Sequence, residues 1–267
     1  MFVLSRSDLG VKEELACFEV SDWAKTGWIR HAFLTRKGGI SPAPFRSLNL
    51  STAAGDSERN VSGNRQVVAF AFHFKPNRLV LLHQKHGDRI LVLKGPRAPD
   101  PRDLDYDAVV TDSPGRFLGI KTADCLPILV VDRAKKIVAA IHAGRQGTAF
   151  QITRTTIQGM GAEFGSVPTD LWIAVGPSIG RCCYEIDEKV FSREWEPFAV
   201  SKGEGKWMLD LPAINIDQMK KEGVPEDHIT RIDLCTRCHP DFFFSYRGEG
   251  TTGRQLSFIG ITESPSM

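Results

Sequence analysis

Three short segments rich in valine, isoleucine and leucine constrain the fold more than any other feature. They are FLGIK (117–121), CLPILVVD (125–132) and KIVAAIHAG (136–144). Runs of this length and composition are typical of strands buried in a sheet. A turn at residues 133–135 joins the last two, so we expect these to pair as a hairpin. The chain must therefore build at least one buried β-sheet.

The rest of the sequence predicts helices interspersed with further strands. Helical spacing of apolar residues indicates helices at 148–164, with Gly165 as the stop, and at 187–198 and 211–222. We find no repeat or Gly/Ser linker, and we expect residues 1–267 to form one domain. The fold class expected is α/β (α+β), a layered sandwich with a mixed sheet and flanking helices. Other expected elements are two β-rich segments joined at a His-Gly turn (78–93), a proline-rich surface loop (94–103), a strand (170–180) and a closing hairpin (242–261).

Charge and hydropathy exclude several classes of function. The 34 basic and 32 acidic residues are spread along the chain and give a formal charge of +2, which disfavours nucleic acid and membrane surfaces as partners. No apolar run approaches the ~20 residues of a spanning helix, so we expect a cytoplasmic protein. Six irregularly spaced cysteines fit reduced thiols in that compartment.

Side chains that can carry chemistry lie where the predicted strands begin and end. Asp124 and Cys125 directly precede a strand, and His142 lies where the next strand leads into a glycine-containing turn. Either His83 or His86 could join them. Two imidazoles and a thiolate form a three-ligand zinc set that leaves a fourth position open. The alternatives are a cysteine nucleophile with a histidine base, or plain core packing of these residues.

Four other cysteines carry weaker signals. Residues 235–239 spell C-x-x-C-H, but no second pair stands at the spacing of a zinc ribbon. Cys182 and Cys183 are adjacent, which points their side chains apart on an extended backbone. The sequence favours packing roles for both pairs.

An ordered set of motifs resembles the laccase-domain family, also called the multicopper polyphenol oxidoreductase or YfiH family. The resemblance spans residue 31 to the carboxyl terminus, and so many motifs in one order are highly specific. They are TRKGGIS (35–41), SLNL (47–50), QKHG (84–87), TADCLPIL (122–129), HAGRQG (142–147), GPSIGRCCYE (176–185) and FFSYRGEGTTGR (243–254).

The resemblance implies a zinc site formed by His86, Cys125 and His142, which selects His86 over His83. It also implies a fold similar to cytotoxic necrotizing factor-like cysteine hydrolases. The implied activity is phosphorolysis of adenosine, inosine or S-methyl-5′-thioadenosine, with adenosine deamination as a second activity. Many members carry an aromatic residue after HAG where this chain has Arg145, which bears on substrate preference and leaves the zinc ligands unchanged.

Phosphorolysis needs cations for phosphate and donors for the departing purine. Within the resemblance, we assign Arg36 and Arg247 to phosphate, Asn49 to the nucleoside and Arg254 to substrate binding. Asp124 is a candidate acid or base for deamination, and equally a partner of a ligating histidine. The partners expected are a purine nucleoside and phosphate, and the sequence leaves monomer and dimer open.

Two rival functions stay open at this point. The older family name suggests copper oxidation of phenols, and a His, His, Cys set also suits a blue-copper site. Seven histidines are too few for a four-copper cluster, so copper would occupy a single site. The second rival is a metal-free hydrolase or amidase with Cys125 as nucleophile and His142 as base.

Overall fold

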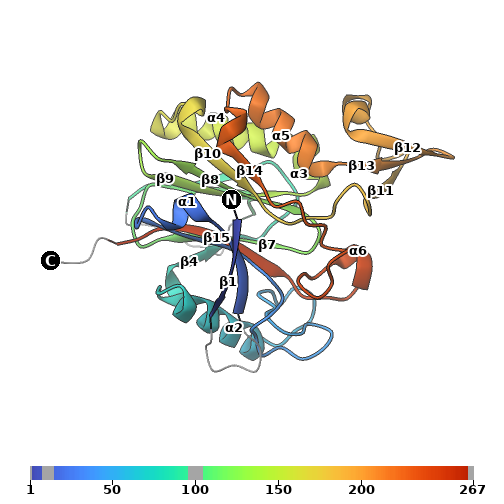
Figure 1. Ribbon diagram of the computed structural model, residues 1–267. Coiled ribbons are helices and arrows are strands. Elements are labelled where there is room, and N and C mark those ends of the chain that lie inside the picture. The colour runs from blue at the N-terminus through green and yellow to red at the C-terminus, as the bar shows by residue number, and fades with distance from the viewer. Residues whose placement is uncertain (1, 8–14, 96–104, 264–267) are drawn as a thin grey trace.

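The fold is a sandwich of two β-sheets with helices on both outer faces (Figure 1). The computed structural model describes residues 2–7, 15–95 and 105–263. In Figure 1, α3, α4 and α5 cover the upper sheet and α2 lies below the lower one. The predicted layered α/β sandwich with mixed sheets is confirmed.

Both large sheets have six strands and mixed direction. In each, most neighbours run antiparallel, while β4 pairs with β7, β5 with β6 and β10 with β14 in parallel. The first sheet has the order β1 (Phe2–Ser7), β2 (Leu15–Val20), β3 (Ile29–Leu34), β15 (Gln255–Ile261), β7 (Phe117–Thr122), β4 (Leu79–Leu81). The second has the order β14 (Ile229–Arg231), β10 (Leu171–Val175), β8 (Leu126–Asp132), β9 (Ile137–Ala143), β6 (Ala108–Thr111), β5 (Ile90–Leu93).

The helices and a small third sheet complete the described chain. The third sheet has the order β11 (Glu185–Asp187), β13 (Lys206–Leu209), β12 (Ala199–Gly203). The α-helices are α1 (Ser21–Ala24), α2 (Glu58–Ala71), α3 (Arg145–Ala149), α4 (Ile152–Phe164), α5 (Leu211–Lys221) and α6 (Tyr246–Glu249).

Three apolar clusters hold the layers together. Between the sheets, side chains such as Phe33, Ile120 and Leu129 are completely buried. The cluster above the second sheet includes Met160 of α4 and the one below the first sheet includes Val68 of α2. Strands β8 and β9 are buried along their whole length because both of their faces are covered, which explains their mostly apolar sequences.

The expected helix at 148–164 is present but starts late. Gln151 adopts a left-handed conformation (φ 60°) that separates α3 from α4, and Gly165 (φ 68°) ends α4 as predicted. The helix expected at 187–198 is wrong. Residues 185–187 form a strand, and only the 3₁₀ helix Arg193–Phe198, with Pro197 inside it, is helical.

The segment at 78–93 holds the two expected strands, and β4 belongs to the first sheet while β5 belongs to the second. The closing hairpin is absent from residues 242–261, where α6 precedes the single strand β15. Ser245 accepts a hydrogen bond from the Gly248 N–H and so begins α6. The predicted loop at 94–103 lies mostly outside the described residues.

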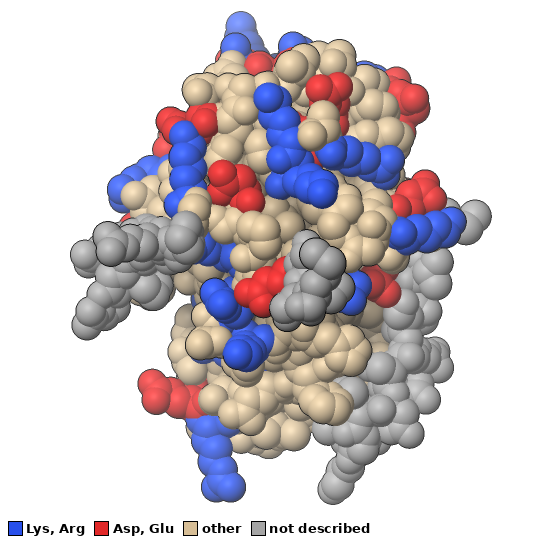
Figure 2. All heavy atoms as spheres, turned by 90° about the vertical axis from the view of Figure 1, so that its left-hand side faces the viewer, with Lys and Arg blue, Asp and Glu red and all other residues tan. Residues whose placement is uncertain are grey.

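The surface agrees with the near-neutral sequence. Figure 2 shows basic and acidic side chains interspersed over the face that it presents. Among the helices described, none has the length and apolar character needed to cross a membrane.

Candidate metal centre and adjoining pocket

His86, Cys125 and His142 come together as the motifs predict. Their ligand atoms, one from each side chain, all lie within 4.8 Å of one another. His142 lies on β9, Cys125 directly precedes β8, and His86 lies on the loop from β4 to β5 in a left-handed conformation (φ 61°). His83 lines the same pocket but does not belong to this cluster.

The sheet topology explains the meeting. Strands β8 and β9 pair antiparallel with Pro127 opposite His142, which places Cys125 beside the end of β9. The β4–β5 and β7–β8 connections, which carry His86 and Cys125, both pass from the first sheet to the second. The cluster therefore lies where the two sheets are joined.

Asp107 contacts both histidines, and it is not among the residues expected from the sequence. This carboxylate is 1% exposed and contacts His142 Nδ1 at 2.7 Å, so His142 Nε2 is left to act as the ligand atom. It also accepts hydrogen bonds from the backbone N–H groups of His86 (2.9 Å) and Gly87 (2.7 Å). Such a carboxylate–histidine pair fixes the tautomer and orientation of a metal ligand. An aspartate before a strand carries no motif of its own.

The electrostatics of the cluster favour a thiolate. Burial opposes ionisation of Cys125, but the charge of His142 and hydrogen bonds from His142 and His86 lower the thiol pKa to about 6. Burial likewise disfavours the charged form of His142, yet Cys125 and Asp107 raise the pKa of His142 to about 9. Without a metal, the thiolate is paired with an imidazolium near neutral pH, so metal binding must displace the His142 proton.

Gly144 leaves room for the ligands. A Cβ there would stand 2.7 Å from His86 Nδ1 and 3.1 Å from Cys125 Sγ, while its backbone angles (φ −75°, ψ 177°) suit any residue. We therefore expect Gly144→Ala to weaken zinc binding by about tenfold or more without straining the backbone. Chelator competition measures the affinity. Gly159→Ala on α4, which meets only a flexible Ile90 tip, is the control, and equal affinity in both variants would contradict this reading.

Asp124 directly precedes Cys125 in the chain, but its carboxylate contacts other segments. Its carboxylate accepts hydrogen bonds from Thr236 Oγ1 (2.6 Å), Ser245 Oγ (2.7 Å) and the Arg247 backbone N–H (2.6 Å). The side chain is buried, and its backbone is left-handed (φ 93°). These contacts give Asp124 the geometry of an anchor for the closing segment of the chain.

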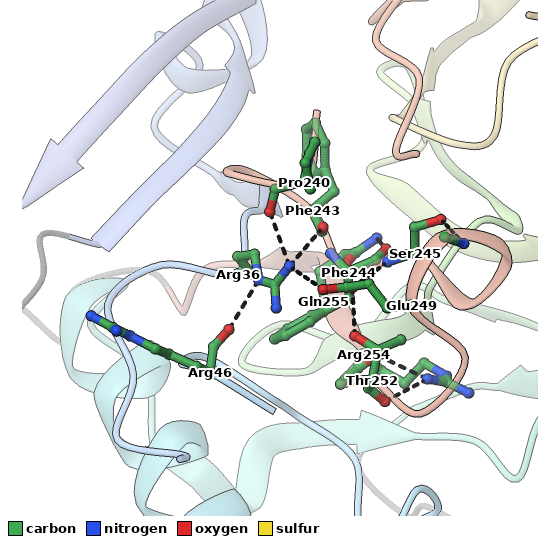
Figure 3. Close-up of polar contacts among 12 residues, drawn as sticks. Arg36, Arg46, Pro240, Phe243, Phe244, Ser245, Glu249, Thr252, Arg254 and Gln255 are labelled. Carbon is green, nitrogen blue, oxygen red and sulfur yellow. Dashed lines mark hydrogen bonds and ion pairs between the residues drawn. The ribbon is translucent and has the colours of Figure 1, made fainter. Parts of the chain in front are cut away.

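Arg36 and Asn49 form hydrogen bonds with loop residues and lie outside the pocket. Figure 3 shows the Arg36 guanidinium donating to the carbonyls of Arg46 and Pro240 and to Glu249 Oε1, at 2.8–2.9 Å. Asn49 is fully buried and accepts from the Arg254 backbone N–H (2.8 Å). Neither lines the pocket that holds the metal ligands. Their contacts favour a role in shaping the loops over a direct contact with substrate.

The two remaining predicted arginines differ. Arg247 donates to the Glu185 carbonyl at 3.1 Å and lies over the Tyr184 ring, outside the residues that line the pocket. Arg254 lines the pocket, where its Nη1 donates to the carbonyls of Thr252 and Gly253. Of the four predicted substrate residues, Arg254 alone lies with the metal ligands.

The pocket beside the metal ligands has a volume of about 640 Å³ and is lined by four cationic side chains, of which Lys85 pairs with Asp105 at 3.5 Å. Arg254 is joined there by Arg65 of α2 and Lys121 of β7, neither of which the sequence indicated. Arg65 Nε is buried and has no hydrogen-bond partner among the described residues. Burial, followed by repulsion from Arg65 and Arg254, lowers the pKa of Lys121 to about 8. Among the described residues that line the pocket none is a carboxylate, and cations gathered in this way favour an anionic ligand.

Comparison with known proteins fits this architecture. Residues 30–262 match the family described as multi-copper polyphenol oxidoreductase laccase. The chain belongs to this family. It is 31% identical to purine nucleoside phosphorylase YlmD of Bacillus subtilis over 92% of this chain and 94% of that one. It is 35% identical to the YlmD phosphorylase of Geobacillus stearothermophilus over 86% of this chain and 89% of the relative.

Solved structures of family members share the whole fold. The crystal structure of YlmD from Geobacillus stearothermophilus superposes with a TM-score of 0.85 at 31% identity, covering 93% of this chain and 96% of that one. The Bacillus licheniformis hypothetical protein YfiH gives a TM-score of 0.84, also at 31% identity, covering 92% and 96%. The family membership expected from the motifs is thus confirmed.

Proposed function

We propose that this enzyme is a zinc-dependent purine nucleoside phosphorylase acting on adenosine, inosine or S-methyl-5′-thioadenosine. The observation that carries the proposal is one pocket lined by both the His86, Cys125, His142 set and the cations Arg65, Lys121 and Arg254. Its volume of about 640 Å³ suits a small ligand such as a nucleoside with phosphate. The names of the curated relatives point to the same reaction.

The donor set fits zinc. Two imidazoles and a thiolate are ordinary zinc ligands, and a site with three protein ligands keeps a fourth position for water or substrate. Asp107 holds His142 through Nδ1, which supplies the outer contact that such sites use. When bound, zinc would supply Lewis-acid polarisation of a substrate oxygen. Copper accepts the same donors, and an intense blue colour of the purified protein would identify it.

The cations explain how phosphate is bound. In phosphorolysis a phosphate oxygen forms a bond to ribose C1′ while the bond from C1′ to the purine nitrogen breaks. Arg65, Lys121 and Arg254 would hold the phosphate and align it for this displacement. This assignment replaces Arg36 and Arg247, whose side chains do not line the pocket.

Product analysis tests the reaction. Zinc-loaded protein is incubated with adenosine, with and without phosphate, and the products are separated by chromatography. We expect adenine and ribose 1-phosphate only with phosphate, and no product from His86→Ala or Cys125→Ser. Inosine formed without phosphate would identify adenosine deamination as an activity, and the absence of every product would reject both.

Lys121 gives phosphate binding a pH dependence. Because its pKa is lowered to about 8, Lys121 is charged below that pH and loses its proton as the pH rises through it. We expect the KM for phosphate to rise about tenfold from pH 7 to pH 9, the worth of one charged hydrogen bond. Lys121→Arg keeps the charge and should flatten the profile. Equal profiles in both proteins would exclude Lys121 from the phosphate site.

One observation favours a second candidate, a metal-free cysteine hydrolase. Asp107, His142 and Cys125 form an array in which the carboxylate orients the imidazole and the imidazole contacts the thiol. If this array is catalytic, activity must survive chelation and disappear on alkylation of Cys125. Loss of activity on chelation, with recovery on adding zinc, would support the phosphorylase instead.

A further inference from the structure

Four cysteines outside the candidate active site converge on one point. Cys182 and Cys183 follow β10 on one loop, and Cys235 and Cys238 follow β14 on another. Their four Sγ atoms all lie within 4.8 Å of one another. The Cys238 Sγ lies 3.5 Å from Cys182 Sγ and 3.4 Å from Cys183 Sγ. In the sequence these cysteines stand as two separate pairs.

The local backbone explains why the separate packing roles do not hold. Residues 181–183 form a turn, not an extended strand, so adjacent side chains need not point apart. The Cys183 and Tyr184 N–H groups both donate to the Gly180 carbonyl, which closes this turn. The C-x-x-C segment forms a second turn, closed by the His239 N–H donating to the Cys235 carbonyl at 3.1 Å. Each turn presents two thiols to the other.

The spacing of the sulfur atoms suits one tetrahedral ion. Zinc–sulfur bonds of about 2.3 Å in a tetrahedron place the sulfurs about 3.8 Å apart, close to the contacts seen here. Disulfide sulfurs are about 2.0 Å apart, so the thiols that contact one another are not in bonded geometry. Two ligands from each of two turns make up a complete Cys₄ set.

The surroundings of Cys235 suit a thiolate ligand. The Gly180 N–H donates to Cys235 Sγ at 3.3 Å, as backbone groups do around metal-bound sulfur. A Cβ on Gly180 would lie 3.2 Å from Cys235 Cβ and 3.4 Å from Cys182 Sγ, so glycine keeps this approach open. Arg181 lines the same surface cavity as Cys182, Cys235 and Cys238. Arg231, Asp210 and Asp233 line it as well, so the charges around the cysteines are mixed and the geometry of the sulfur atoms defines the site.

Both turns also contact Asp124. The Ile179 N–H, in the first loop, donates to the Asp124 carbonyl at 2.9 Å. Thr236, between the two cysteines of the second loop, donates to the Asp124 carboxylate at 2.6 Å. Asp124 directly precedes Cys125 of the candidate active site. An ion that joins the two turns would therefore fix both contacts of the residue beside a catalytic ligand.

We propose that Cys182, Cys183, Cys235 and Cys238 bind a second, structural zinc ion that joins these loops behind the active site. The four protein ligands close the coordination sphere, so this ion is held without an open position for substrate. The site is separate from the His86, Cys125, His142 cluster and stands on its own geometry whichever reaction the enzyme performs.

Metal counting on the full-length chain tests the proposal. His86→Ala with Cys125→Ser removes the first site, and zinc per chain is measured by mass spectrometry after dialysis. We expect about one zinc ion in this double variant, and none after Cys235→Ser and Cys238→Ser are added. Cys17→Ser in the same background is the control, because Cys17 belongs to neither cluster and should leave the zinc content unchanged.

A second measurement avoids relying on the fold of the quadruple variant. Cobalt is added to the double variant, and four thiolate ligands should give intense sulfur-to-cobalt charge-transfer absorption. Bound zinc should also protect the same four cysteines from alkylation until a chelator is added. A double variant that binds no zinc or cobalt, with its four thiols alkylated at the same rate with or without zinc or joined in disulfides, overturns the proposal.

Discussion

Replacing Asp107 with asparagine is expected to weaken zinc binding by about 10- to 100-fold, the usual effect of losing the carboxylate behind a histidine ligand. The amide keeps the size of the side chain but removes the charge that faces His142 Nδ1 at 2.7 Å. It also turns either its oxygen or its NH₂ group toward the His86 and Gly87 N–H groups that now share the carboxylate. One substitution therefore disturbs two of the three ligands, and phosphorolysis should fall with zinc occupancy.

Asp105→Asn is the matched control, because Asp105 is more than half exposed and pairs with Lys85 on the surface. Zinc affinity is measured by chelator competition, and activity at saturating and at limiting zinc. If Asp107→Asn retained wild-type affinity, the carboxylate would not orient the ligands. If activity fell at saturating zinc with affinity unchanged, Asp107 would act with Cys125 and His142 as in the hydrolase.

Asp124→Asn is expected to lower the free energy of unfolding by about 3 kcal/mol, the cost of losing charged hydrogen bonds and leaving a buried donor unpaired. Asparagine tolerates the left-handed backbone at this position, so the change is confined to the carboxylate. Its oxygen can still accept from Thr236 and Ser245, but its NH₂ group then faces the Arg247 N–H. The closing segment should loosen where it meets the active site.

Urea denaturation measures this effect, with the surface variant Asp22→Asn as control, since Asp22 is 66% exposed. A stable Asp124→Asn protein that has lost only deamination would restore the acid or base role considered for this residue. A destabilised protein with unchanged product ratios would identify Asp124 as an anchor.

Cys125 and His142 could be found in the sequence because each stands beside a recognisable strand, whereas the choice of His86 over His83 came from the resemblance to the family motifs. Asp107, Arg65 and Lys121 could not be found in the same way. The register of β6 and β7 and the packing of α2 bring these residues to the site from positions far apart in the chain. The assignment of Arg36 to phosphate was based on its local sequence alone. Its glycine-rich loop suits an anion, yet the carbonyls of a distant segment and Glu249 occupy its guanidinium.

Fold elements followed the same division. Strands β7, β8 and β9 were predictable because both faces are largely buried and their sequences are mostly apolar. The prediction of a closing hairpin was wrong because Phe243 and Phe244 lie in a loop and are nevertheless buried. Ser245 holds this loop to Asp124, so apolar residues there do not indicate a strand. The pairing of two cysteine turns likewise depends on tertiary structure that separate motifs do not encode.

The β4–β5 and β7–β8 connections, two of those that pass from one sheet to the other, have a mechanical consequence. His86 and Cys125 lie on these connections, while His142 belongs to the second sheet. An ion bound by all three residues would therefore link the two sheets. Sliding of one sheet over the other would pull the ligands apart. Metal affinity should therefore depend on how the two sheets are aligned. Substitutions in the core between the sheets should change that affinity without contacting the site.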